Sequence, residues 1–135
     1  MLLLFKRRLI TMTTETDIAA LFDRWNESLQ TGEPDNVVAN YAERSILLPT
    51  VSNQPRLTAE EKKDYFVHFL ANKPSGVINL RQITIADTLA VDSGVYTFTF
   101  GTTGQEVKAR YSFTYQLIDG EWLIVSHHSS GMPEA

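Results

Sequence analysis

The stretch DGEWLIVSHHSSGMPEA, residues 119–135, decides the fold class. Asp119 and Gly120 form a turn signal, and the residues that follow, EWLIVSHHSS, have the composition of a strand. Two adjacent histidines close this strand, so HHSS is either a reactive cluster or only a strand end. Because neighbouring residues on a strand point to opposite faces, His127 and His128 are not expected to hold one metal ion together.

Three upstream segments show the period-two alternation of apolar and polar residues that is typical of strands. They are VINLRQITIADTLAV (77–91), GVYTFTF (94–100) and EVKARYSFTYQLI (106–118). With the final strand they predict an antiparallel meander, whose turns are DSG (92–94), GTTG (101–104) and DG (119–120). In this prediction Asp87, Asp92 and Asp119 all lie at strand ends or turns.

Alternation also predicts which side chains of the meander face the core. Tyr96, Phe98 and Phe100 should share one face of their strand. The corresponding face of the next strand carries Val107, Ala109, Tyr111, Phe113, Tyr115 and Leu117. The opposite face of the two strands is rich in hydroxyl groups and carries Val95, Thr97, Thr99, Arg110, Ser112, Thr114 and Gln116. Such a face can pair with a second copy of itself under twofold symmetry.

Two capping boxes predict the starts of two amphipathic helices. Thr14 and Asp17 open the segment TETDIAALFDRWNESLQTG, which Gly32 ends, and Thr58 and Glu61 open TAEEKKDYFVHFLAN. The first helix buries Ile18, Leu21, Phe22, Trp25 and Leu29, and the second buries Tyr65, Phe66, Phe69 and Leu70.

Between these helices we expect a short helix and a short strand. The segment 34–42, PDNVVANYA, begins with a proline and should turn Val37, Val38 and Tyr41 inward as a helix. The segment 45–52, SILLPTVS, should be a strand that enters a loop at its proline. Three N-terminal helices on one face of a strongly bent, mainly antiparallel sheet make an α+β fold, and such a sheet leaves a cone with a pocket at its open end.

Length and composition restrict the class of protein. With 135 residues, 43% of them apolar, we expect a single domain over residues 14–135. Residues 1–13 are expected to be a disordered extension, with a short basic membrane contact as the alternative. A net charge of −4 argues against a nucleic-acid partner, and the absence of cysteine excludes thiolate metal sites. No apolar run is long enough to span a bilayer, so a cytoplasmic location is the simplest expectation.

The C-terminal motif resembles the last strand of the association domain of calcium/calmodulin-dependent protein kinase II. The matching residues, in order, are Asp119, Gly120, Trp122, Val125, His128, Ser130, Gly131 and Pro133. The segment 18–42 is similar to the opening helix pair of the same family, and the chain looks closest to its stand-alone bacterial members of the SgcJ/EcaC type. One departure is Ser129, because the kinase domain has an arginine of its anion pocket at this position.

This resemblance implies the cone-shaped nuclear transport factor 2-like fold, which SnoaL-like cyclases and ketosteroid isomerase-like enzymes share. It also implies association through the sheet, so the expected partner is a second copy, in a homo-oligomer of at least two chains. The resemblance does not imply a particular chemistry, because function depends on the site rather than the fold.

The histidines and arginines are the candidates for chemistry in the cone. His128, which a regular strand places with Trp122, Ile124 and Ser126, could act as an acid or base. Arg81 and Arg110 could bind a carboxylate, although each could equally pair with an acidic side chain or face solvent.

The aromatic residues Trp25, Tyr41 and Tyr65 project from segments that should lie against the sheet. Their rings could line a ligand pocket, or they could be ordinary core residues. We therefore expect a ligand-binding pocket of Trp25, Tyr41, Tyr65, Arg81, Arg110 and His128, with no metal and no cofactor.

The sequence favours a self-associating domain that binds a small polar or carboxylate-bearing molecule. The alternative is a small cyclase or isomerase in which His128 is the acid or base and Arg110 or Tyr41 polarises a carbonyl. A scaffold that binds another protein is a third possibility. The chain has no Gly-rich or catalytic loop of a kinase, so kinase activity is excluded.

Overall fold

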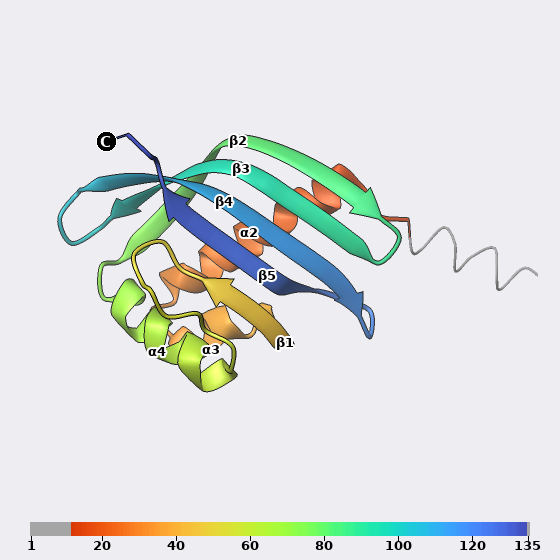
Figure 1. Cartoon of the computed structure of the whole chain (residues 1–135), viewed down its shortest axis with the longest axis horizontal. Coiled ribbons are helices and arrows are strands. Elements are labelled where there is room, and N and C mark those ends of the chain that lie inside the picture. The colour runs from red at the N-terminus through yellow and green to blue at the C-terminus, as the bar shows by residue number, and fades with distance from the viewer. Residues whose placement is uncertain (1–11, 135) are drawn as a thin grey trace, which may run out of the picture.

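The computed structural model describes residues 12–134, and the predicted extension before Met12 lies outside them (Figure 1). Within residues 12–134, three helices and five strands follow one another as α2 (Glu15–Gln30), α3 (Pro34–Val38), β1 (Tyr41–Leu48), α4 (Ala59–Leu70), β2 (Pro74–Ala86), β3 (Leu89–Phe100), β4 (Glu106–Ile118) and β5 (Glu121–Gly131). The strands form one sheet in the order β1-β5-β4-β3-β2. All neighbouring strands are antiparallel except β1, which pairs with β5 in parallel.

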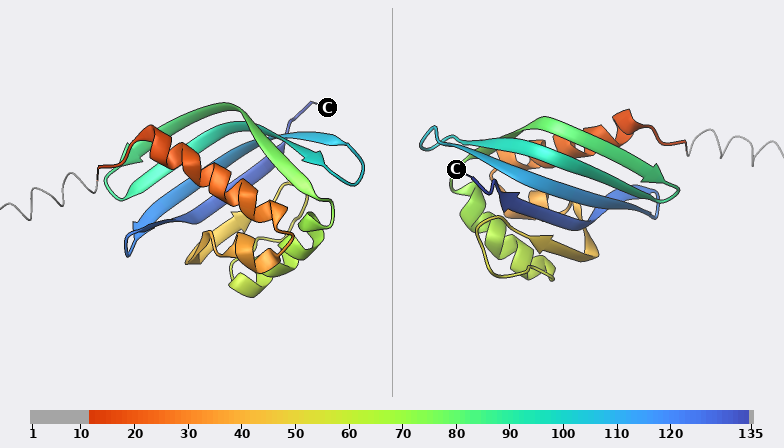
Figure 2. Two further views of the ribbon diagram at one scale, coloured as in Figure 1. Left: turned by 180° about the vertical axis from the view of Figure 1, so that it is seen from behind. Right: turned by 45° about the horizontal axis from the view of Figure 1, so that its top comes forward.

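The sheet is bent, and α2 lies along its inner face, with α3, α4 and β1 gathered at one end (Figure 2). We call the side covered by α2 the inner face and the opposite side the outer face. This arrangement confirms the predicted α+β class and the nuclear transport factor 2-like cone.

Both predicted capping boxes are present. The Thr14 amide donates to Asp17 Oδ2 at 2.9 Å and the Asp17 amide donates to Thr14 Oγ1 at 3.2 Å. The equivalent bonds between Thr58 and Glu61 are 2.8 and 3.0 Å. Each pair satisfies amide groups that the first helical turn leaves without a partner, so the sequence marked both helix starts correctly.

The short helix ends earlier than predicted. Helix α3 stops at Val38, and the Asn40 side chain then bonds to the carbonyl of Val37 at 3.1 Å. The carbonyl of Asn40 accepts the amide of Ile124 at 2.9 Å, so pairing with β5 has already begun. Tyr41 is therefore the first residue of β1 and not a helical residue, and the predicted inward helical position for it is wrong.

The predicted turn at residues 92–94 is also wrong. Strands β2 and β3 are joined at Asp87, which has φ +55°, and β3 continues without a break through Asp92 and Gly94. Gly94 is needed for a different reason: a Cβ atom there would lie 1.8 Å from the carbonyl oxygen of Leu80. The two strands come this close beside a bulge in β2, where Asn79 is the additional residue between the paired positions.

A second bulge changes the faces of β5. Thr114 pairs with Ser126 and Tyr115 pairs with Ile124, so Val125 is an additional residue in β5. After this bulge the inward positions move by one residue, and His127 rather than His128 joins Ile124 on the inner face. The predicted grouping of His128 with Ile124 is therefore wrong.

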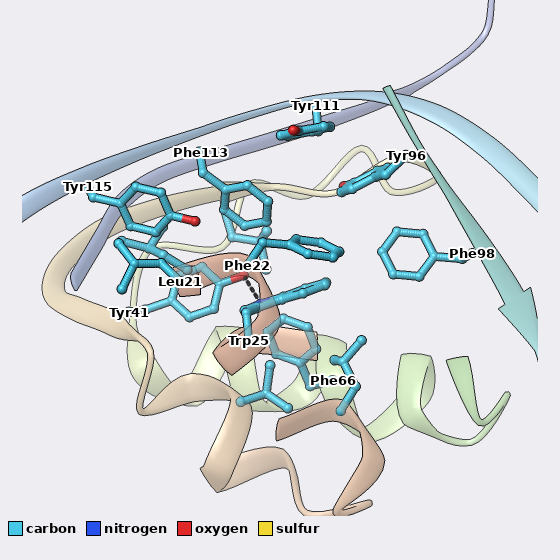
Figure 3. Packing of buried hydrophobic residues seen from close by; sticks show 14 of the residues in the cluster. Leu21, Phe22, Trp25, Tyr41, Phe66, Tyr96, Phe98, Tyr111, Phe113 and Tyr115 are labelled. Carbon is cyan, nitrogen blue, oxygen red and sulfur yellow. Dashed lines mark hydrogen bonds between the residues drawn. The ribbon is translucent and has the colours of Figure 1, made fainter. Parts of the chain in front are cut away.

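The core lies between α2 and the inner face of β3, β4 and β5 (Figure 3). Trp25 packs edge-on against Phe113 and Phe98, with ring centroids 5.6 and 5.9 Å apart, and Phe22 packs edge-on against Phe113 at 6.2 Å. These are favoured aromatic geometries. The burial of Tyr96 and Phe113 confirms the inward faces predicted from alternation in β3 and β4.

Candidate functional site

A cavity of about 500 Å³ opens beside this core, between the inner face of the sheet, α4 and the segment that follows β1. Its lining comes from α2, β1, α4, β3, β4, β5 and the connecting loops: Trp25, Leu47, Pro49, Thr50, Val51, Tyr65, Phe66, His68, Phe69, Asn72, Tyr96, Phe98, Phe100, Gln105, Val107, Ala109, His127 and Ser129. The volume is within the range of about 300–1,000 Å³ for small-molecule sites.

Most of the cavity wall is apolar, and seven of its eighteen lining residues are phenylalanine, tyrosine or tryptophan. Phe69 contacts Phe98 edge-on at a centroid distance of 5.5 Å, and Tyr65 stacks on Phe69 at 5.7 Å. Burial raises the pKa of the Tyr65 phenol to about 12, so this ring is neutral near pH 7. Such a wall offers an apolar molecule a large contact area without a charge.

One part of the wall is polar and holds a chain of buried hydrogen bonds that begins at Trp25. Trp25 Nε1 donates to Tyr41 Oη at 3.2 Å, and Tyr41 Oη lies 2.8 Å from His127 Nδ1. On the other side of the imidazole, His127 Nε2 lies 3.3 Å from Tyr96 Oη. Tyr96 Oη donates to Ser129 Oγ at 2.7 Å.

The chain ends at Thr50, whose Oγ1 lies 2.5 Å from Ser129 Oγ. Thr50 belongs to the segment after β1, and both of these hydroxyl groups line the cavity. This series of hydrogen bonds thus extends from the core beneath α2 to the cavity wall.

His127 is the centre of the chain and is uncharged. Its ring is 3% exposed and stacks on Phe113 at a centroid distance of 4.0 Å. Burial lowers the pKa of His127 to about 3, and the neighbouring His128 adds to this effect. A neutral imidazole donates from one nitrogen and accepts at the other, which matches its position between two phenols.

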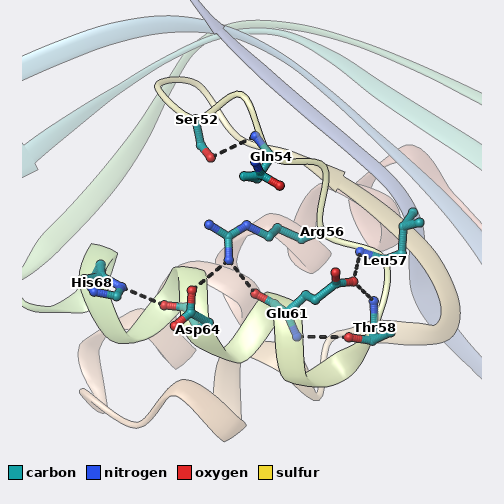
Figure 4. Close-up of polar contacts among 8 residues, drawn as sticks. All are labelled: Ser52, Gln54, Arg56, Leu57, Thr58, Glu61, Asp64 and His68. Carbon is teal, nitrogen blue, oxygen red and sulfur yellow. Dashed lines mark hydrogen bonds and ion pairs between the residues drawn. The ribbon is translucent and has the colours of Figure 1, made fainter.

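A polar network joins the segment before α4 to the first turns of this helix (Figure 4). Arg56 Nη1 bonds to Asp64 Oδ2 at 2.9 Å and to the carbonyl of Glu61 at 3.1 Å. Arg56 also pairs with Leu47 of β1 through two backbone bonds of 2.9 and 3.0 Å. One arginine therefore connects β1 to α4.

Lys62 makes a second connection between the same elements. Its side chain is 1% exposed, and Nζ donates to the carbonyls of Ser45 at 3.2 Å and Leu57 at 2.7 Å. Burial lowers the pKa of this ammonium group, and the two carbonyls replace part of its lost hydration.

Three of the aromatic predictions are placed at or beside the cavity. Trp25 and Tyr65 line it. Tyr41 lies behind the lining, where burial raises its pKa well above the usual value. Its hydroxyl accepts a bond from Trp25 (Figure 3) and also bonds to His127.

The other three predicted pocket residues, Arg81, Arg110 and His128, are not among the residues that line the cavity. Arg81 lies on the inner face but bonds to the buried carboxylate of Asp92, with Nη2 to Oδ2 at 2.7 Å. Arg110 and His128 are exposed on the outer face, paired in register with Ser130 and Ser112. An acid or base role for His128 inside the cone required it to face the cavity, and the bulge at Val125 turns it away.

Sequence reasoning missed the residues that form the polar wall. His127 was assigned to the wrong face, and Ser129 and Thr50 carried no recognisable motif. Tyr96 could have been found, because alternation already placed it inward beside Phe98. The inward position of His127 depends on the bulge at Val125, and this bulge is defined by the pairing of β5 with β4 rather than by a local sequence pattern.

Asp92 is a further buried polar residue that sequence reasoning placed in a turn. Its carboxylate is fully buried and accepts bonds from Arg81 and from the Tyr111 hydroxyl, the latter at 2.8 Å. This cluster does not line the cavity.

Within residues 12–134, no helix is long and apolar enough to cross a membrane. In the same part of the chain, no three histidine or acidic side chains lie close enough together to hold a metal ion.

Comparison with solved structures shows the same fold in several bacterial proteins. A protein from Xanthomonas campestris, described as a calcium/calmodulin dependent protein kinase II association domain, is 50% identical, with a TM-score of 0.86 and 91% of each chain covered. A protein of the same description from Thiobacillus denitrificans is 12% identical, with a TM-score of 0.71, and the match covers 84% of this chain and 94% of that chain.

A nuclear transport factor 2-like protein of unknown function from Pseudomonas putida is 16% identical, with a TM-score of 0.75. That match covers 86% of this chain and 84% of that chain, and at this identity it supports the fold alone. A search of curated proteins found no match. The family model for the calcium/calmodulin dependent protein kinase II association domain matches residues 14–133, so the chain belongs to this family.

Proposed function

We propose that the cone binds a small, neutral and largely apolar molecule that carries one hydrogen-bonding group. The observation that carries this proposal is the combination of an aromatic cavity with a buried chain of neutral hydrogen bonds that opens into it. Ligand sites commonly pair a large apolar surface with a few precisely placed polar groups.

The proposal replaces the expected carboxylate-bearing ligand with a neutral one. Among the described residues, the lining contains no arginine or lysine, and its histidine beside the core, His127, is held neutral by burial. A carboxylate entering this site would lose its hydration without gaining an arginine or lysine partner, which is unfavourable. A neutral molecule with an apolar ring system would lose little hydration and would gain contacts with Phe69 and Phe98.

Binding can be tested with 1-tetralone, a neutral bicyclic ketone, and the variant Val107→Trp. Val107 lines the cavity from β4, so a tryptophan there should fill part of it and weaken binding by at least about tenfold. The matched control is Lys108→Trp, since Lys108 is the next residue and lies on the outer face. Titrations monitored by NMR chemical shifts of the native protein and both variants measure the effect.

A native protein that shows no saturable shifts with 1-tetralone or with a panel of similar neutral bicyclic compounds would contradict the proposal. Equal weakening by Val107→Trp and Lys108→Trp would contradict it as well, because the effect would then not depend on the cavity.

We also propose that the chain self-associates through the outer face of the sheet. The supporting observation is a group of exposed apolar side chains on β2 and β3, which includes Val77 at 62% and Leu80 at 66% exposure, with Leu89 and Val91 beyond them. Grouped apolar residues on a sheet surface are typical of an interface. Membership of an association-domain family supports a second copy as the partner.

Sedimentation velocity at micromolar concentration tests self-association. The native chain is expected to sediment as a dimer or larger species, and Leu80→Lys combined with Val91→Lys is expected to shift it to the monomer. Leu57→Lys is the control, because Leu57 is 54% exposed but lies before α4, away from the sheet. A monomeric native chain would overturn this proposal.

A further inference from the structure

We infer that the cone selects a ligand with a hydrogen-bond acceptor, such as a carbonyl oxygen, and that Thr50 Oγ1 donates to it. The inference rests on the proposed ligand-binding function and adds the chemical class of the ligand's polar group. The inference follows from which group donates and which accepts in each of the buried hydrogen bonds between Trp25 and Thr50.

Two groups in this series of hydrogen bonds have a known role as donors. Trp25 Nε1 carries a hydrogen and can only donate, so Tyr41 Oη accepts from it. At the other side of the chain, Tyr96 donates its single proton to Ser129 Oγ. Tyr96 therefore has no proton left for His127 and can only accept from Nε2.

These constraints select one tautomer of His127. Nε2 must carry the hydrogen that bonds to Tyr96 Oη, so Nδ1 of the neutral ring has a lone pair. Tyr41 then donates its proton to Nδ1 at 2.8 Å. In the opposite tautomer, Tyr41 would receive two hydrogens and its own proton would have no acceptor among the described residues.

The order continues to the cavity. Ser129 Oγ already accepts from Tyr96, and the acceptor within reach of its own proton is Thr50 Oγ1 at 2.5 Å. Either hydroxyl of this pair can donate to the other, and when Ser129 donates to Thr50 Oγ1, no acceptor among residues 12–134 takes the proton of Thr50. Because Thr50 lines the cavity, the last group of the chain presents a donor to whatever occupies it.

The chain also makes this donor stronger than an isolated hydroxyl. Each hydroxyl that accepts a bond becomes a better donor, so the five bonds from Trp25 to Thr50 act in one direction. A ketone, aldehyde, ester or amide oxygen satisfies the donor at Thr50. A ligand whose only polar group is a donor, such as an ammonium ion, leaves the Thr50 proton without an acceptor.

The experiment compares two ligands of nearly the same shape in three proteins. 1-Tetralone has a carbonyl oxygen, and tetralin is the same bicyclic skeleton without it. Dissociation constants for both are measured by NMR titration with the native chain, with Thr50→Val, which has no hydroxyl but a similar shape, and with Thr50→Ser, which keeps the hydroxyl. Using ratios within each protein removes the difference in water solubility between the ligands.

In Thr50→Val, the affinity for 1-tetralone is expected to fall about fivefold relative to that for tetralin. In Thr50→Ser, the native ratio is expected to remain. The carbonyl stretching frequency of bound 1-tetralone should be lower in the native chain and in Thr50→Ser than in Thr50→Val, because the valine side chain cannot donate a hydrogen bond to it.

An unchanged affinity ratio in Thr50→Val, with both ligands still binding, would overturn the inference and leave the cavity function intact. A native chain that binds neither ligand would overturn the ligand-binding function itself, together with the inference. Folding of each variant is checked by its thermal melt before titration, and Thr50→Ser supplies the comparison if the valine lowers stability.

Discussion

Replacing Arg81 with methionine is expected to lower the free energy of unfolding by about 3–5 kcal/mol, a large share of what a domain of this size has. The guanidinium group makes two bonds to Asp92, at 2.7 and 3.3 Å, and the Asp92 carboxylate has no exposure to water. Without Arg81, the carboxylate keeps only the Tyr111 hydroxyl as a partner. The cost is therefore mainly that of a buried charge left without its counter-ion.

The double variant Arg81→Met with Asp92→Leu distinguishes this cause from lost packing. When both charges are removed, most of the stability should return, because an apolar pair of similar volume needs no hydration. Urea denaturation of the native chain, the single variant and the double variant provides the three free energies. A single variant as stable as the native chain would show that the ion pair contributes nothing, and a double variant less stable than the single one would contradict the electrostatic explanation.

Acidification is expected to destabilise the fold through His127. Burial holds its pKa at about 3, whereas in the unfolded chain a histidine has a pKa of about 6.5. As the pH falls below 6.5, His127 binds a proton in the unfolded chain but stays neutral in the folded chain. The stability contributed by neutral His127 is thus complete above pH 6.5 and is lost progressively toward pH 3.

Between pH 7.5 and pH 5.0 this single group should remove roughly 2 kcal/mol from the free energy of unfolding. The measurement is urea denaturation at several pH values for the native chain and for His127→Gln, whose amide can still bond to Tyr41 and Tyr96. The glutamine variant should lack this part of the pH dependence, since acidic groups titrate alike in both proteins.

His128→Gln is the matched control for the same experiment. His128 is adjacent in sequence but exposed on the outer face, so its replacement should leave the slope of stability against pH almost unchanged. If His128→Gln removed the dependence and His127→Gln did not, the assignment of the buried histidine would be wrong.

The elements that the sequence predicted correctly are those with strong local signals. The capping pairs of Thr14 and Thr58 act within one helical turn, and the alternation in β4 reports directly which side chains reach the core. Such signals need no knowledge of a neighbouring strand. The fold class and the burial of Trp25 and Phe113 followed from them.

The wrong predictions, of a turn at residues 92–94 and of an inward His128, arose where pairing with a neighbouring strand overrides the local sequence pattern. The segment around Gly94 has the composition of a turn, yet the glycine is required by the close approach of Leu80 on β2. Val125 is an ordinary apolar strand residue, and its additional position in β5 depends on pairing with β4. Residues near these two bulges, Asp92 and His128, were consequently misplaced.

The cavity was predicted only in part for a similar reason. Its aromatic wall followed from residue type and helical spacing, which placed Trp25 and Tyr65 correctly. Its polar wall joins α2, β1, the following loop, β3 and β5, and only the folded chain brings Thr50 next to Ser129. Arg81 was expected in the cavity because a guanidinium group can bind a carboxylate ligand. In the folded chain its partner is the carboxylate of Asp92.

The additional residue in β5 places Ile124 and His127, which are three positions apart, on the same face of the sheet. Before Val125 the strand follows one alternation, and after it the opposite one. A relative without this one residue would have regular alternation here and would keep the counterpart of His127 inward, because the pairing of Ile124 with Tyr115 and of Ser126 with Thr114 would be retained. The loss of Val125 would therefore leave the histidine of the cavity wall in place.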